Sequence, residues 1–113
     1  AAGFDLIEIW AAKLREFLRN NTAADLKRLL EENDLKPYSI NSIEHITFRN
    51  ADDYEKIKAE CKELSAIAGE IGCPYVVVVP GKLPENAGEQ KIIDESVKVL
   101  SELADIAENY DVS

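Results

Sequence analysis

The sequence predicts an α/β fold in which strands alternate with helices. Apolar, β-favouring segments begin near residues 5, 37 and 74, about 32 and 37 residues apart, which is the length of one strand and one crossover helix. The run from Val76 to Val79 is apolar without alternation, as in a strand buried on both faces. Burial on both faces indicates a parallel sheet, and 113 residues suffice for one domain of this kind.

The first strand is predicted over residues 5–10. Gly3 is typical of a helix end, and the residues that follow it are apolar and favour β-structure. Leu14, Phe17 and Leu18 then indicate a short amphipathic turn. We therefore expect the chain to leave this strand through a compact turn before the next helix.

A helix that begins after Thr22 is predicted from its capping signal. Thr22 is followed three residues later by Asp25, which resembles a capping box, and leucines in the next two turns form one apolar face. The helix is expected to end near Asn33, because Pro37 cannot continue it. Residues 37–43 are the second predicted strand.

The clearest helical periodicity runs from about residue 52 to Ile71, after a polar loop over residues 44–50. Its apolar side chains recur every three or four residues, with lysine and glutamate between them. Gly72 is well placed to stop this helix, and the third strand is predicted over residues 73–79.

A last long helix is predicted over residues 93–107, after a glycine- and proline-containing loop over residues 80–86. Gly81 and Lys82 are weak evidence for a phosphate site, because a phosphate cradle requires several backbone amides. Both ends of the sequence resemble cuts inside a repeating pattern. The chain starts at Ala1 and contains no methionine, so we expect it to be processed, trimmed or engineered.

Composition excludes several classes of function. A net charge of −9 opposes binding to phosphate backbones, so we expect no nucleic-acid partner. The longest apolar run is far shorter than the roughly 20 residues that span a bilayer, and no signal peptide opens the chain, so we expect no membrane partner. Cys61 and Cys73 are too few for a disulfide framework and are interpreted as buried apolar residues, which favours the cytoplasm.

Three strand–helix units fit either an open flavodoxin-like sheet or part of a barrel, and periodicity does not choose between them. The segments that carry a resemblance are GFDLIEI at residues 3–9, LKPYSINS at 35–42, IGCPYVVVVP at 71–80 and SVKVLSELADIAE at 96–108. With the helix entry at Thr22, they resemble the xylose isomerase-like TIM-barrel superfamily. Its inosose isomerase branch is the one that the chain resembles most.

The resemblance implies a partial (β/α)8 TIM barrel, with residues 1–113 as a single partial-barrel domain that holds the second, third and fourth strands. It further implies that the parent protein is a metal-dependent isomerase or epimerase of carbohydrate metabolism, acting on a small sugar or polyol. The divalent metal (Mn, Zn, Co or Mg) is then held by carboxylates and a histidine on later strands, beyond Ser113. This segment is expected to supply scaffold and pocket walls, and to be inactive alone.

Candidate site residues lie where the predicted strands end, because active sites of such barrels lie at the carboxyl ends of strands. Glu8 is either a pocket carboxylate that faces a polyol or an inward polar residue satisfied by a neighbour. Trp10 either stacks on a sugar or covers hydrophobic core under the first loop, and aromatic burial favours the second.

Asn41 and His45 are the candidates at the end of the second strand. The Asn41 amide offers a donor and an acceptor to a hydroxyl group, although a turn residue that caps the strand is an alternative. His45, beside Glu44, is either a proton carrier or metal ligand, or a solvated loop side chain, and the second is more common. No residue of the chain is assigned as catalytic or as a metal ligand.

Two other functions remain open. The chain is alternatively a trimmed or engineered barrel fragment that acts only as a self-associating structural module, because its sheet edges and apolar faces need cover. The superfamily also contains abasic-site endonucleases, which the acidic net charge disfavours. We expect self-association, or pairing with the rest of a barrel, both for a segment of an isomerase and for a structural module.

Overall fold

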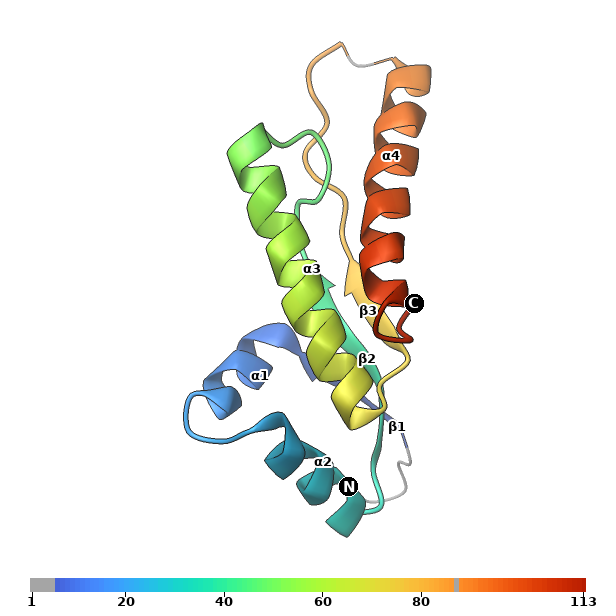
Figure 1. Ribbon diagram of the computed structural model, residues 1–113. Helices are drawn as coiled ribbons and strands as arrows, with labels where there is room; N and C mark the ends of the chain where they lie inside the picture. Colours follow the sequence, from blue (N-terminus) through green and yellow to red (C-terminus); the bar gives the residue numbers. More distant parts are fainter. Residues whose placement is uncertain (1–5, 87) are drawn as a thin grey trace.

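Strands and helices alternate in the computed structural model, which describes residues 6–86 and 88–113 (Figure 1). This order confirms the predicted α/β class. The expected helix end at Gly3 and the expected strand start at Asp5 lie outside the described residues. The elements are β1 (Leu6–Trp10), α1 (Ala11–Leu18), α2 (Ala23–Glu32), β2 (Lys36–Ile43), α3 (Ala51–Ile71), β3 (Tyr75–Val78) and α4 (Glu89–Glu108).

The three strands form one parallel sheet in the order β1-β2-β3. Trp10 of β1 lies opposite Asn41 of β2, and Asn41 lies opposite Val77 of β3. Because the strands are parallel, their carboxyl ends meet at one edge of the sheet. The segments that were predicted to carry site residues therefore come together.

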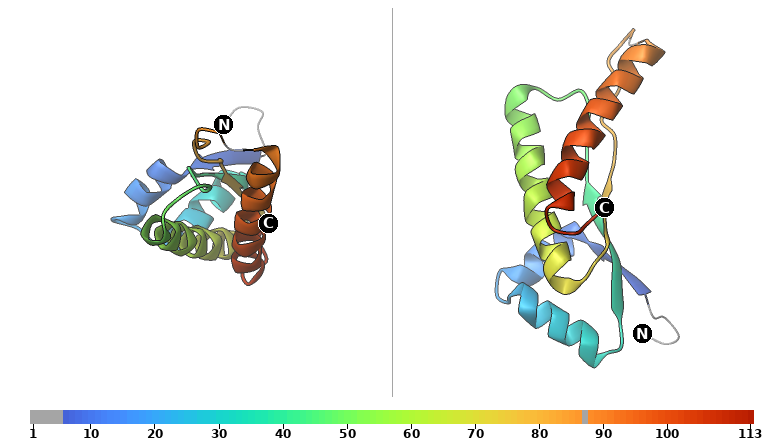
Figure 2. Two further views of the ribbon diagram at one scale, coloured as in Figure 1. Left: turned by 90° about the horizontal axis from the view of Figure 1, so that it is seen from above. Right: turned by 45° about the vertical axis from the view of Figure 1, so that its right-hand side comes forward.

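The four helices of the described residues lie on the same side of the sheet (Figure 2). Ile40 and Ile43 of β2, together with Leu64 and Ala68 of α3, have no exposed surface and form the centre of the core. Burying these side chains is the main source of stability, at about 1.5–3 kcal/mol for each large aliphatic side chain. The core therefore lies between the sheet and the helix layer.

The opposite face of the sheet is open, which corrects the prediction for the third strand. Val76, Val77 and Val78 are only half-buried, and Tyr75 is 44% exposed. The expectation of burial on both faces is wrong, because the described helices cover a single face. Tyr38 and Tyr75, both exposed, pack edge to face with ring centroids 5.2 Å apart.

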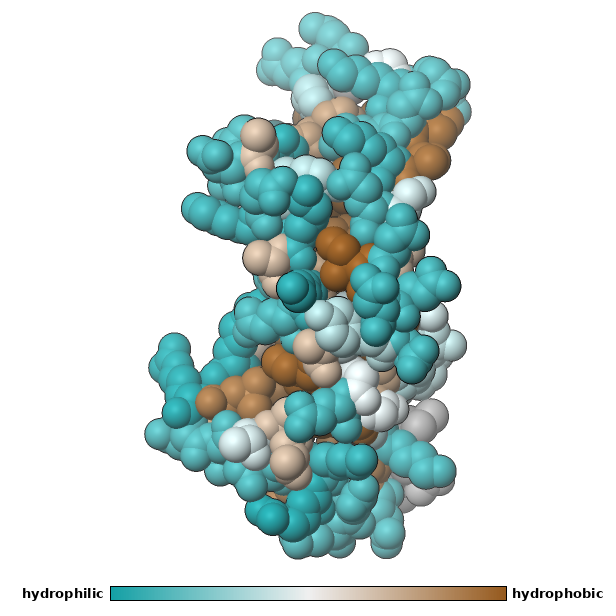
Figure 3. Space-filling model, viewed as in Figure 1, coloured by the Kyte–Doolittle hydropathy of each residue, from teal (hydrophilic) through white to brown (hydrophobic). Residues whose placement is uncertain are grey.

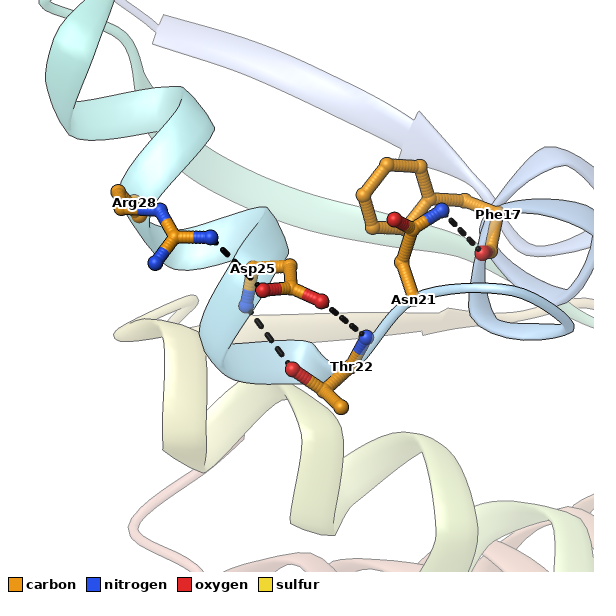
Figure 4. A network of polar contacts seen from close by, with 5 residues as sticks. All are labelled: Phe17, Asn21, Thr22, Asp25 and Arg28. Atoms are coloured by element: carbon orange, nitrogen blue, oxygen red, sulfur yellow. Dashed lines mark hydrogen bonds and ion pairs between the residues drawn. The ribbon is translucent and has the colours of Figure 1, made fainter.

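The capping signals in the sequence form as predicted. The Thr22 hydroxyl accepts a 3.1 Å hydrogen bond from the Asp25 N–H, and the Thr22 N–H donates a 2.9 Å bond to the Asp25 carboxylate (Figure 4). These bonds hold the pKa of Asp25 below its usual range. Gly72 ends α3 with φ of 78°, a left-handed conformation that glycine adopts without strain.

The predicted turn after β1 is a complete helix, α1. Its buried residues Ala11 and Leu14 are three apart and face the sheet, so packing stabilises eight residues that carry no side-chain cap. No element among the described residues is a helix long and apolar enough to cross a membrane.

Helices α3 and α4 are joined by polar and apolar contacts. The Tyr54 hydroxyl donates a 2.7 Å hydrogen bond to Glu102, and burial together with this carboxylate raises the pKa of Tyr54.

Cys61 and Cys73 are free and buried, as expected, and burial raises the pKa of both thiols. This chemistry favours a packing role for both cysteines.

Candidate functional site

A polar hollow of about 640 Å³ lies at the carboxyl edge of the sheet. It lies where β1 and β2 end, beside α1 and α3. The two predicted residues that the sheet brings together, Trp10 and Asn41, both line it. Its lining residues are Trp10, Ala11, Ala12, Arg15, Asn41, Ser42, Glu44 and Glu60.

Two pairs of polar side chains border the hollow. Arg15 of α1 donates a 2.7 Å hydrogen bond to the carboxylate of Glu60 on α3. The Ser42 hydroxyl lies 3.3 Å from the Glu44 carboxylate. Together with the Asn41 amide, these groups offer donors and acceptors over a small volume. Such a lining suits a ligand that carries several hydroxyl groups.

Trp10 does not cover the core, which corrects the interpretation that aromatic burial favoured. Trp10 is 65% exposed, because it is the last residue of the edge strand β1 and the described helices pack on the other face of the sheet. An exposed indole beside hydrogen-bonding groups presents a flat apolar surface to a ligand. Its exposure excludes the core-covering interpretation of Trp10, and stacking on a sugar ring stays a prediction.

Glu8 lies two residues before Trp10 on β1, so the two side chains leave the strand on the same side. Glu8 is exposed and lies opposite Ser39 of β2 in the sheet register. It does not line the polar hollow, whereas it borders an apolar groove beside α1 and α2. The structure therefore separates Glu8 from Asn41.

His45 lies in the loop after β2 and also remains outside the hollow. Its side chain is 62% exposed, and its Nε2 atom is 4.0 Å from a carboxylate oxygen of Glu44. Its φ of 55° is left-handed, a conformation that few non-glycine residues adopt. His45 is thus held at the rim, one residue from the lining residue Glu44.

The loop that carries Glu44 and His45 is fastened to the loop after β3. The Val79 N–H donates to the Ile43 carbonyl, and the Ile46 N–H donates to the Val79 carbonyl, at 2.9 and 3.1 Å. The Gly81 N–H donates a 2.8 Å bond to the hydroxyl of the buried residue Thr47. These bonds extend the β2–β3 pairing beyond the strands and fix the rim of the hollow.

Gly81 is required by this contact. A Cβ atom at Gly81 would overlap the carbonyl oxygen of Thr47. The Gly81 N–H is already engaged by Thr47, so it is not directed at an anion. The glycine is explained by close backbone approach, in agreement with the weakness of Gly81 and Lys82 as a phosphate signal.

Among residues 6–86 and 88–113, no group of three or more histidine, cysteine, aspartate or glutamate side chains is placed to hold a metal. Glu44 and Glu60 both border the hollow, but Glu60 is engaged by Arg15. The described residues therefore do not fit a divalent metal.

Sequence reasoning did not find Arg15 and Glu60. They are 45 residues apart, and each belongs to a helix in which charged side chains are common. Only the fold, which places α1 and α3 on the same side of the sheet, brings them together. Ser42 and Glu44 lie within the Asn41–His45 segment that the strand-end rule had indicated.

Comparison with known proteins agrees with the fold. The family described as xylose isomerase-like TIM barrel matches residues 1–113. The chain is 35% identical to an inosose isomerase of Halalkalibacterium halodurans over 97% of its length, and 33% identical to one of Bacillus subtilis over 97%. It spans only 39% and 40% of these relatives.

Solved structures give the same result. A structure described as the IolI protein with a binding zinc atom has a TM-score of 0.89 and 33% identity, and the match covers 98% of this chain and 40% of that one. D-psicose 3-epimerase of Clostridium cellulolyticum has a TM-score of 0.74 at 18% identity over 97% of this chain and 40% of that one, which shows the fold alone. The chain belongs to the xylose isomerase-like TIM barrel family and holds about two fifths of such a barrel.

Proposed function

We propose that this chain forms one wall of the substrate pocket in a metal-dependent isomerase or epimerase of small polyols or keto-sugars. The observation that carries the proposal is the polar hollow at the carboxyl edge, where Trp10 and Asn41 lie side by side. Barrel enzymes bind their substrates at this edge. Relatives named inosose isomerase at 32–35% identity support a polyol ketone as the substrate class.

Each lining group has a chemical role in this proposal. The Asn41 amide donates to one hydroxyl oxygen and accepts from another. The exposed Trp10 indole packs on the apolar face of the ring. Arg15 is neutralised by Glu60 and acts as a neutral pair that binds hydroxyl groups. In this proposal, Glu8 reaches the substrate only from the open face of the sheet. His45 reaches it only from the rim of the hollow.

The metal belongs to the complete barrel in this proposal. The IolI structure, described with a bound zinc atom, supports metal dependence, whereas the described residues of this chain do not form a metal site. In the complete barrel, a metal would supply Lewis-acid chemistry at a carbonyl. The 113-residue chain is then a binding wall without a catalytic centre. Its two buried free thiols support a reducing compartment such as the cytoplasm.

The proposal is tested by titrating inosose into the ¹⁵N-labelled chain and following amide and indole signals. We expect shifts at Trp10, Asn41 and Ser42, and Asn41→Ala should weaken them. Asn109→Ala is the matched control, because Asn109 is an exposed amide at the far end of α4. Equal effects of both variants, or shifts that avoid the hollow, would contradict the proposal.

A second measurement tests the location of the metal ligands. Inosose is incubated with the 113-residue chain and with Mn²⁺ or Zn²⁺, and isomerisation is followed by chromatography. We expect no metal-dependent rate. A rate that rises with metal would show that this chain holds a metal site of its own.

A further inference from the structure

The positive charge in the polar hollow is already neutralised by a carboxylate of the chain. Of the described residues that line the hollow, Arg15 alone is a cation. One of its guanidinium nitrogens lies 2.7 Å from a carboxylate oxygen of Glu60, and the two side chains are 41% and 30% exposed. Because the pair is partly shielded from water, solvent screens it less than a fully exposed pair. Glu60 therefore offsets the charge of Arg15 inside the hollow.

The start of α1 adds further groups that favour anions. Ala11 and Ala12 are the first two residues of α1, and both line the hollow. The first N–H groups of an α-helix have no intrahelical partner, and the N-cap residue Trp10 has no side-chain oxygen to accept from them. A helix N-terminus and a guanidinium both attract negative charge. Without Glu60, the hollow would thus combine two groups suited to an anion.

The acidic groups of the hollow outweigh this attraction. Its charged lining residues are the carboxylates of Glu44 and Glu60 and the guanidinium of Arg15, so their net charge is −1. The chain as a whole carries −9, and hydrophilic side chains cover most of the helix layer in view in Figure 3. A phosphate or carboxylate that entered the hollow would meet uncompensated negative charge. A hydroxyl group meets no such repulsion, and repulsion of one ligand class is a means of selecting another.

We propose that Glu60 is a specificity-determining residue, which neutralises Arg15 and so makes the hollow select uncharged polyols and ketoses over sugar phosphates and sugar acids. Glu60 acts through Arg15 and is not a catalytic residue. The inference rests on the proposed function, because it takes the hollow as the substrate pocket.

A structural tie between α1 and α3 is the alternative role of the Arg15–Glu60 pair. Removing a tie would weaken the binding of every ligand, or lower stability, without creating a new affinity. Removing a neutralising charge would instead free the guanidinium, whose fork of N–H donors matches phosphate and carboxylate oxygens. A gain of anion binding therefore distinguishes selection of ligands from a structural role.

The test titrates inorganic phosphate into the ¹⁵N-labelled chain and its Glu60→Gln variant. Glutamine retains the size of the side chain and an oxygen that accepts from Arg15, but it removes the charge. We expect no saturable shift of the Arg15 Nε–H signal in the wild type. Glu60→Gln should bind phosphate at least about tenfold more tightly, with shifts at Arg15 and at the Ala12 amide.

Two further variants serve as controls. Glu70→Gln removes the same charge from an exposed position of α3, ten residues and about 15 Å further along the helix. This distance exceeds the Debye length of about 8 Å at physiological ionic strength, so the variant should bind phosphate as weakly as the wild type. Combining Arg15→Gln with Glu60→Gln should abolish the gain, because the guanidinium that binds phosphate is then absent.

A matched pair of ligands measures the selectivity itself. Myo-inositol and myo-inositol 1-phosphate differ only by the phosphate group, and each is titrated into the wild type and Glu60→Gln. We expect the ratio of the two affinities to move toward the phosphate by about tenfold or more in the variant. Thermal melts verify that each variant remains folded.

Several results would overturn the proposal. Saturable phosphate binding at Arg15 of the wild type would do so without any variant. Equal phosphate affinity of wild type and Glu60→Gln, or a gain that Glu70→Gln or the double variant shares, would do so as well.

Failure of the proposed function is distinguishable from failure of this inference. If Glu60→Gln gains phosphate binding at Arg15 but inosose causes no shift at Asn41 of the wild type, the neutralising role of Glu60 stands and the substrate pocket does not. If inosose shifts Asn41 but Glu60→Gln gains no phosphate binding, the pocket stands and the role of Glu60 is refuted.

Discussion

The two faces of the sheet differ in how completely this chain covers them. On the helix side, Ile40 and Leu64 have no exposed surface. On the opposite face, Trp10 is 65% and Tyr75 is 44% exposed. The described helices therefore cover one face of the sheet, whereas the other face is left open. Stability resides on the first face, and the proposed binding functions on the open face and at the edges.

The largest expected effect comes from the covered face. Leu64→Ala removes a fully buried side chain of α3 and should lower the free energy of unfolding by about 2–5 kcal/mol. Leu83→Ala, in an exposed loop, should change it by less than about 0.5 kcal/mol. Urea denaturation followed by circular dichroism measures both. Equal losses in the two variants would refute the contrast between covered and open regions.

Gly81→Ala tests the contact between the loops that follow β2 and β3, at the carboxyl edge of the sheet. The added methyl group would overlap the Thr47 carbonyl, and overpacking of this kind costs about 1–3 kcal/mol. Gly88→Ala is the control, because a Cβ atom there meets nothing within 4 Å. Gly88→Ala weakens the N-cap of α4 but reduces the conformational entropy of the unfolded chain. The free energy of unfolding should therefore change by less than about 1 kcal/mol. A neutral Gly81→Ala variant in the same denaturation experiment would show that the loops are not fastened as described.

Thr22→Ala probes the surface of the helix layer. Loss of the capping hydroxyl should cost about 1 kcal/mol, and Thr22→Ser should retain most of it. The folded pKa of Asp25 lies below its ordinary value of 3.8, mainly through the Thr22 backbone hydrogen bond. Its contribution to stability is therefore complete above pH 3.8 and is lost as the pH falls through the folded pKa. When the Asp25→Asn variant is titrated with acid, it should not show this loss of stability. The same loss in the variant would show that another group causes it.

The smallest effect is expected on the open face. Trp10→Ser should change the free energy of unfolding by less than about 0.5 kcal/mol, because the indole is mostly exposed. It should at the same time reduce the binding of a hydrophobic dye to the chain. A loss of stability comparable to that of Leu64→Ala would mean that the open face is packed in solution.

Local signals in the sequence predicted much of the helix layer. Thr22 with Asp25, and Gly72, marked a helix start and a helix end, because capping needs only neighbouring residues. The unbroken apolar run of the third strand predicted the parallel sheet, although the burial on both faces from which it was inferred is wrong. Asn41 and Trp10 were predicted at the carboxyl edge from strand ends alone, and the register places them side by side.

Features that depend on residues far apart in the chain were not predictable. The Arg15–Glu60 and Thr47–Gly81 contacts join residues 45 and 34 positions apart, and neither pair has a sequence motif. The burial of Val76–Val78 was overestimated because an unbroken apolar run indicates what a strand can bury, not what is present to cover it. The composition of a strand thus predicts how much of it can be buried in a complete barrel, whereas the exposed fractions are those of this chain alone.

Amide hydrogen exchange across the sheet tests the contrast between covered and open regions most directly. Ile40 lies in the central strand β2, and Val76 is bonded to Ser113, so both amides should be strongly protected. The Val78 amide, on the outer edge of β3 beyond Ser113, should exchange much faster at every chain concentration. Protection of Val78 equal to that of Ile40 would show that the β3 edge is already covered, and would contradict the description of the chain as an open barrel wall.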